Sequence, residues 1–200
     1  MILNKFIEKQ KVEKVRNLLN GLVIIFIIMA AITYIGGLKM LGYVLDIMTF
    51  CILIVSNIYF YKVKVLYKKY TKYFSHNADW IDKNRNMANI IDKDTVDLFA
   101  YTKYNEIKRL GNSVLNDSVI VKDGYYSAIS LSFITVGINM IYDLYRFTVN
   151  ELSPFIFAII VLISLFLMIP IIQNIKDIDV IKKTIKGFIT DKGWDKKWKK

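Results

Sequence analysis

The chain has 200 residues, a formal net charge of +11 at pH 7 and a hydrophobic content of 54%. This content excludes an ordinary soluble domain, because the apolar residues are concentrated in four blocks that are each near the length of a bilayer crossing. A single cysteine excludes a disulfide framework within the chain. We therefore expect an all-α integral membrane protein with four transmembrane helices arranged as two hairpins, and a cytoplasmic helical extension between the second and third crossings.

The positive charge follows the predicted topology and does not by itself mark a nucleic-acid-binding surface. Residues 1–17 carry five basic and two acidic side chains, residues 62–124 carry twelve and eight, and residues 174–200 carry nine and four. The short connections on the other side contain only Lys39 and Glu151, which cancel. Basic residues accumulate on the cytoplasmic side of a membrane. We expect both termini and the central region in the cytoplasm, and the crossings in a bacterial inner membrane.

The first two crossings form a hairpin over residues 18–61. Residues 1–17 precede it, either as an amphipathic helix on the inner membrane surface or as a solvated basic leader. The first crossing, Leu18–Ile35, ends at two glycines that permit a tight turn, and the second crossing, Met40–Tyr61, follows almost at once. Small and polar residues recur along one face of the second crossing at steps of four, three and seven residues: Gly42, Asp46, Thr49 and Ser56.

Residues 62–124 are predicted to begin as a continuation of the second helix into the cytoplasm. Tyr59 and Tyr61 precede this region, where aromatic residues suit the membrane interface. The interleaving of basic and aromatic residues either holds an anionic ligand or stacked bases, or follows acidic lipid headgroups. A second cytoplasmic helix is predicted from Asp94 to Leu110. The lysines concerned are Lys62, Lys64, Lys68, Lys69 and Lys72.

The third crossing, Tyr125–Val149, carries a polar stripe. Polar groups at membrane depth are costly and normally face a helix bundle or a water-filled path. The stripe either lines a central path in a homo-oligomer, where carboxylates favour cations, or joins the second and third crossings by hydrogen bonds without a pore. Its residues follow at steps of three, four, four and three, and so share one helix face: Ser132, Thr135, Asn139, Asp143 and Arg146.

Three charged residues are expected at one depth in the membrane. At the helical rise per residue, Asp46 lies about 9 Å from the outer end of the second crossing, and Asp143 about 9 Å from the outer end of the third. Arg146 lies about 5 Å from that same end. We predict an Asp46–Arg146–Asp143 cluster with one carboxylate in excess. The alternative is that Arg146 extends to the outer surface and pairs only with Asp143.

The fourth crossing, Leu152–Ile172, is nearly all apolar and is expected to face lipid. Ser153 and Pro154 suit a helix start, as the N-cap and the first helical residue. Pro170 is expected to bend or end the helix, because proline lacks the backbone N–H and crowds the preceding turn. This crossing completes the second hairpin, residues 125–173.

The remaining residues, 174–200, form a basic tail. Trp194 and Trp198 lie there among lysines. Tryptophan suits the headgroup region and lysine suits acidic lipid, so both tryptophans are predicted membrane-interface anchors.

Catalysis is not expected from this sequence. His76 is the only histidine and is placed in the cytoplasm, while Cys51 is placed at mid-membrane, buried. A thiol nucleophile needs a base within hydrogen-bond reach, and one histidine with one cysteine does not make a transition-metal site. We predict neither an enzyme nor a bound metal or cofactor.

The layout resembles SLATT-type effectors of bacterial anti-phage systems. The resemblance rests on the basic leader, the tight hairpin Leu18–Tyr61 and the lysine-rich helix Lys62–Ile81, and the second hairpin departs from it. It implies an oligomeric, channel-like effector that permeabilises the membrane or conducts ions. The trigger would be a nucleotide, a nucleic acid or a soluble partner at the basic cytoplasmic face. The alternatives are a bacteriocin-immunity or transporter-accessory subunit, and a membrane sensor paired with a soluble cytoplasmic enzyme.

Overall fold

The computed structural model describes residues 2–36, 39–87 and 123–190, with a few further residues between 102 and 112. Within these ranges four long helices are present and no strand. Each helix contains a segment long and apolar enough to cross a membrane. The predicted all-α membrane protein with four crossings is therefore confirmed. The helices are α1 (Ile2–Gly36), α2 (Lys39–Met87), α4 (Asp123–Thr148) and α5 (Pro154–Thr190).

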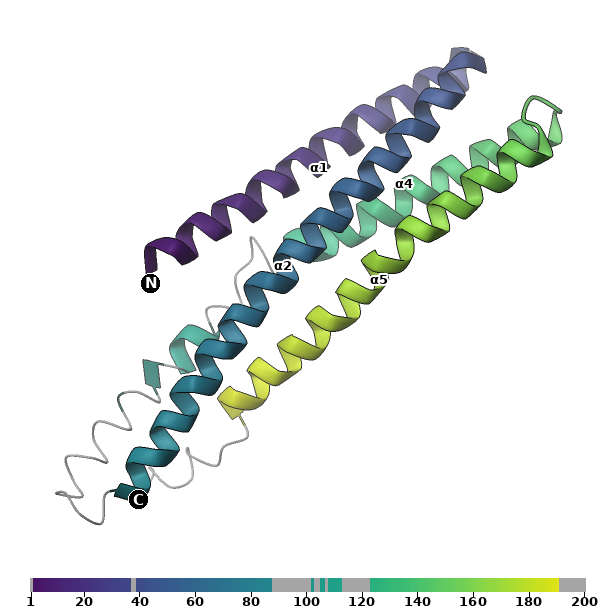
Figure 1. Cartoon of the computed structure of the whole chain (residues 1–200). Coiled ribbons are helices and arrows are strands. Elements are labelled where there is room, and N and C mark those ends of the chain that lie inside the picture. The colour runs from purple at the N-terminus through teal and green to yellow at the C-terminus, as the bar shows by residue number, and fades with distance from the viewer. Residues whose placement is uncertain are drawn as a thin grey trace.

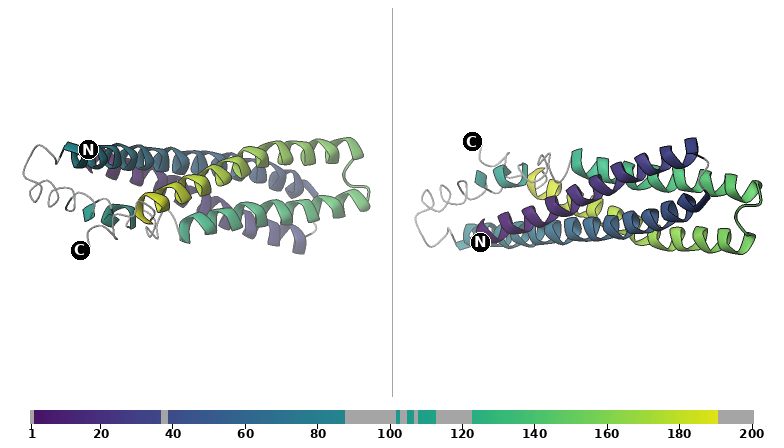
Figure 2. Two further views of the ribbon diagram at one scale, coloured as in Figure 1. Left: turned by 90° about the horizontal axis from the view of Figure 1, so that it is seen from below. Right: turned by 90° about the horizontal axis from the view of Figure 1, so that it is seen from above.

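The four helices form an elongated bundle of two antiparallel hairpins (Figure 1). The first hairpin joins α1 to α2, the second joins α4 to α5, and both reverse direction at the same end of the bundle (Figure 2). We call this the hairpin end, and we call the end from which α1 starts the open end. The central helix is α2, which packs against each of the other three and most extensively against α5.

The buried core follows α2, and the outer faces of the bundle are apolar. Ile52, Leu53 and Phe60 of α2 are completely buried. On α5, by contrast, Phe155 is 75% exposed and Phe166 is 73% exposed. A water-soluble bundle rarely exposes so much apolar surface, whereas acyl chains cover such faces in a membrane. The exposed face of α5 agrees with its predicted contact with lipid.

A tight connection joins α4 to α5. Asn150 adopts a φ of 58°, in the left-handed region, and the N–H of Glu151 donates to the carbonyl of Arg146 at 2.8 Å. This geometry closes the last turn of α4. The Ser153 hydroxyl accepts a 3.3 Å hydrogen bond from the first turn of α5, whose first residue is Pro154. The predicted helix start is confirmed, and it fixes the end of α4 that carries Arg146.

The fourth helix does not end at Pro170. It continues to Thr190, so the first part of the predicted tail is helical, and its axis changes direction along its length (Figure 2). Proline removes one helical hydrogen bond and displaces the preceding turn. In that turn the Asn57 side chain of α2 donates to the carbonyl of Leu167 at 2.8 Å. A neighbouring helix thus binds a carbonyl beside the proline.

Some predicted features lie outside the described residues. These are the glycine turn at Gly37, most of the predicted helix Asp94–Leu110, and the interface residues Trp194 and Trp198. Their roles stay predictions.

Candidate functional site

Polar side chains of α2 and α4 face each other along the interior of the bundle. Every one of them is at most 4% exposed. The spacing by three and four residues explains this, because it holds the polar groups on one face of each helix. We call these residues the seam: Asp46, Thr49 and Ser56 from α2, and Ser132, Thr135, Asn139, Asp143 and Arg146 from α4.

A charged cluster occupies the part of the seam nearest the hairpin end. Arg146 Nη1 donates to Asp46 Oδ2 at 3.1 Å and to Asp143 Oδ1 at 3.0 Å. Asn139 Nδ2 donates to Asp46 Oδ1 and to Asp143 Oδ2, both at 3.0 Å. The predicted contact of Arg146 with both aspartates is therefore present. Because the arginine side chain is only 2% exposed, the alternative in which it extends to the outer surface is wrong.

The guanidinium of Arg146 fits against α2 because residue 42 is a glycine. A Cβ atom on Gly42 would lie 2.8 Å from Arg146 Cζ, closer than two carbon atoms approach without repulsion. The ring of Tyr43 covers the same guanidinium, with 4.5 Å from Cζ to the ring centroid. A cation over an aromatic face is attracted by the ring. The beginning of α2 therefore forms a socket for the arginine.

Gly42→Ala is expected to destabilise the protein by about 1–3 kcal/mol, the usual effect of overpacking. The added methyl group would meet a guanidinium that two carboxylates hold in place. Thermal unfolding in detergent measures the effect. Gly137→Ala is the matched control, because Gly137 is also helical and a Cβ there meets nothing within 4 Å. Equal effects of the two substitutions would contradict the socket.

A pair of serines joins the helices deeper in the seam. Ser132 Oγ donates to the carbonyl of Ala128 at 2.8 Å. A hydroxyl has one hydrogen, so Ser56 is the donor in the 2.7 Å hydrogen bond between Ser56 Oγ and Ser132 Oγ. Thr49 and Thr135 instead donate to carbonyls of their own helices. The charged cluster and the serine pair are thus two levels at which side-chain hydrogen bonds link α2 to α4.

The seam lies inside one chain and not on an outer surface. Because α2 covers the polar face of α4, side chains such as Ser132 and Asn139 do not face a neighbouring subunit in this structure. The arrangement corresponds to the predicted alternative in which hydrogen bonds join the second and third crossings. A central path shared by several subunits would need these residues to leave their present contacts.

A cavity of about 840 Å³ borders Asn139, the amide that donates to both aspartates of the charged cluster. Residues of α1, α2, α4 and the connection between α4 and α5 line it, including Glu151 at the hairpin end and Asn139 beside the two aspartates. The side-chain amide of Asn139 is oriented by its two bonds to carboxylates, and its Oδ1 is buried and without a hydrogen-bond partner. A buried amide oxygen without a partner accepts a donor or a cation. Asn139 therefore connects the lining of the cavity to the two carboxylates of the cluster.

Tyr59 and Cys51 have surroundings that differ from those predicted for them. Tyr59, predicted as an interface anchor, is completely buried, and its ring packs edge-on against Phe60 at 5.2 Å between centroids. It follows Ile52 by seven residues and so continues the buried face of α2. Tyr61, by contrast, is 59% exposed, and its role as an interface anchor stays a prediction. Cys51, predicted to be buried, is exposed.

The predicted lysines differ in their surroundings. Lys64 forms an ion pair with Asp177 and a 3.1 Å hydrogen bond to Asn174 Oδ1, so it links α2 to α5. Three of the lysines are exposed, namely Lys68, Lys69 and Lys72. Lys62 is half-buried. Sequence reasoning missed this link and that of Asn57, because neither spacing nor depth shows which polar residue of one helix meets a distant one.

Comparison with known proteins gives no relative: no protein-family model, curated protein or solved structure matches the chain. The fold and the seam define its class as a multipass membrane protein with a buried charged cluster between two crossings.

Proposed function

We propose that the chain is a channel-like membrane protein that conducts cations along the seam. The observation that carries the proposal is the cavity whose lining includes Asn139, the amide that donates to both carboxylates of the buried cluster. With the aspartates ionised, this cluster has one negative charge in excess. Carboxylates at a constriction favour cations over anions, and the unpartnered Asn139 oxygen adds a further ligand for a cation.

The serine pair would be the closed gate of this path. Beyond the cluster, Ser56 donates to Ser132, and Ser132 donates to the carbonyl of Ala128, so both hydroxyl hydrogens are used within the bundle. Hydrogen bonds between membrane helices contribute about 0.6 kcal/mol on average. Such a contact is strong enough to hold two helices in register and weak enough to exchange for water. Conduction would require α2 and α4 to separate at this level.

The orientation follows from the charge distribution. We place both termini in the cytoplasm of a bacterium, the four crossings in its inner membrane, and the hairpin end outside. The cavity would then open outward. In a Cys51→Ser background, a cysteine introduced at Glu151 should react with a membrane-impermeant maleimide in intact cells, and one introduced at Lys176 only after lysis. The reverse pattern would contradict this orientation.

The resemblance to SLATT-type effectors supports placing this conductance in a bacterial defence system. In that setting the basic cytoplasmic face would receive the trigger, a nucleotide, a nucleic acid or a soluble partner. The chain would act without catalysing a reaction. A homo-oligomer would contain one path in each subunit, since the seam is internal, and would not share a single central pore. The particle mass in detergent measures the number of subunits.

Ion flux into vesicles that contain the purified protein tests the proposed function. We expect potassium uptake above that of protein-free vesicles and little chloride uptake. Asp46→Asn removes the excess negative charge and should lower potassium flux about tenfold, the effect of ~1.4 kcal/mol at the site. Asp177→Asn, the control, removes the same charge outside the seam. The absence of potassium flux, or equal effects of both variants, would reject the proposal.

A further inference from the structure

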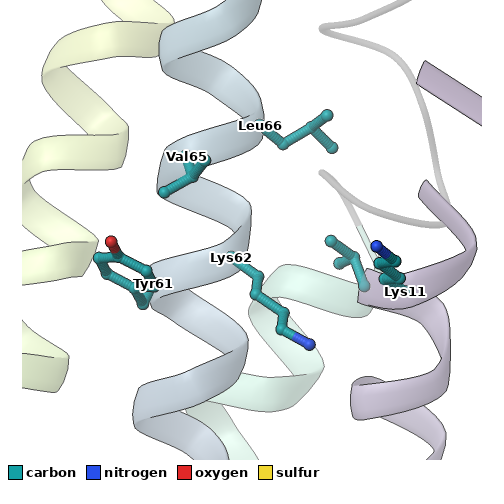
Figure 3. A pocket seen from close by; sticks show the side chains of 6 residues that line it. Lys11, Tyr61, Lys62, Val65 and Leu66 are labelled. Atoms are coloured by element: carbon teal, nitrogen blue, oxygen red, sulfur yellow. The ribbon is translucent and has the colours of Figure 1, made fainter. Parts of the chain in front are cut away.

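A pocket separate from the seam opens between α1 and α2. Its volume is about 160 Å³, and its lining includes Lys11 and Val12 of α1 and Tyr61, Lys62 and Leu66 of α2. Figure 3 shows the Lys62 side chain extending from α2 into the space that separates it from Lys11 on α1. Two positively charged side chains therefore border one small pocket.

The positive charge of the pocket is not balanced within the part of the chain whose side chains are described. Neither Lys11 nor Lys62 forms an ion pair with a carboxylate there, whereas Lys64, two residues further on, is paired with Asp177. Lys62 is half-buried, which reduces its contact with water. Like charges that face each other across a confined space repel, and an anion between them removes the repulsion.

The floor of the pocket is apolar. Val12 and Leu66 are each only 4% exposed and lie beside the two lysines. A pocket for a free inorganic anion needs no such surface. The combination of two ammonium groups with an aliphatic floor suits a phosphate group attached to an apolar body.

The depth of the pocket points to the headgroup layer. Lys11 precedes the end of α1 at Gly36 by 25 residues, and Lys62 follows the start of α2 at Lys39 by 23 residues. At the helical rise the two lysines lie about 38 Å and 35 Å from the hairpin end. The hydrocarbon core is about 30 Å thick. Both ammonium groups therefore reach the level of lipid phosphates on the side of the open end.

We infer that this pocket is a phosphate-binding site in which Lys11 and Lys62 hold the phosphate of an anionic amphiphile beside the apolar lining formed by Val12 and Leu66. The ligand bridges α1 and α2. The site goes beyond the proposed conduction and does not depend on it, because binding can be measured without any ion gradient. A lipid headgroup and a soluble nucleotide share the phosphate chemistry, and the choice of probe distinguishes them.

The test measures dissociation constants for the full chain in a neutral detergent with three probes: short-chain phosphatidic acid, inorganic phosphate and ATP. The double variant Lys11→Gln/Lys62→Gln is compared with Lys68→Gln/Lys72→Gln, which removes the same charge from exposed positions of α2. We expect the first pair to weaken binding of phosphatidic acid about 30-fold, which corresponds to ~2 kcal/mol at ~1 kcal/mol per lysine. The control pair should change it less than about threefold.

Two further comparisons keep the result interpretable. Lys11→Arg/Lys62→Arg preserves the charge and should retain binding, and the melting temperature without ligand shows whether each variant is folded. If binding of ATP or inorganic phosphate depends on the lysine pair and binding of phosphatidic acid does not, the proposed amphiphile is wrong and the inference is overturned. Equal losses from both glutamine pairs, or no binding of any probe to the unmodified chain, would overturn the inference.

Discussion

Arg146→Gln is expected to destabilise the folded protein by about 3–5 kcal/mol, the usual result of removing one partner from a buried ion pair. Without the guanidinium, Asp46 and Asp143 would remain buried beside each other, with Asn139 as their shared donor. Two like charges in such a site cannot both stay ionised without a large cost. We expect a lower melting temperature in detergent and a smaller yield of monodisperse protein.

A neutral version of the cluster separates the effect of charge from that of packing. In the triple variant Arg146→Gln/Asp46→Asn/Asp143→Asn the three residues of the cluster are uncharged, so most of the lost stability should return. Lys176→Gln, which removes an exposed positive charge on α5, should have little effect. If the triple variant is as unstable as Arg146→Gln alone, the arginine stabilises the protein through its contact with Tyr43 and not through charge.

Most of the fold could be predicted from hydrophobic length and charge. Each of the four apolar blocks is near the length that a membrane crossing requires, and a backbone in lipid must satisfy its own hydrogen bonds. The start of α5 followed from Ser153 and Pro154, whose roles at a helix N-terminus are local. Pro170 was predicted to bend or end α5, and the choice between the two depends on a neighbouring side chain, Asn57, which binds the carbonyl of Leu167 in the preceding turn.

The seam could be predicted in part. Spacing placed the polar residues of α4 on one face, and the fixed rise of a helix placed Asp46 and Arg146 at similar depth. Spacing within one helix does not show what its polar face meets, so the choice between a shared pore and a helix contact remained open until α2 was seen to cover α4. Tyr59 was misassigned because an aromatic residue near the interface suits both headgroups and core.

The Lys11–Lys62 pocket could not be predicted from the sequence for a similar reason. The two lysines are separated by almost the whole of the first hairpin and approach each other only because α1 and α2 are antiparallel. Basic residues near a membrane predict contact with acidic lipid in general. The pairing of two particular lysines over Val12 and Leu66 requires the packing of one helix on the other.

A reversible disulfide in place of the serine pair is expected to have the second large effect, the loss of ion flux. This experiment tests conduction through the seam most directly. The hydroxyl oxygens of Ser56 and Ser132 are 2.7 Å apart, so cysteines at these positions should be able to form a disulfide, whose sulfur atoms are about 2.05 Å apart. The variant Ser56→Cys/Ser132→Cys is made in a Cys51→Ser background, and that background alone is the control for the oxidant. Potassium flux into vesicles is then measured before and after reduction. We predict that oxidation lowers the flux to that of protein-free vesicles and that reduction restores it. Equal flux in the oxidised and reduced protein would show that cations do not pass between α2 and α4.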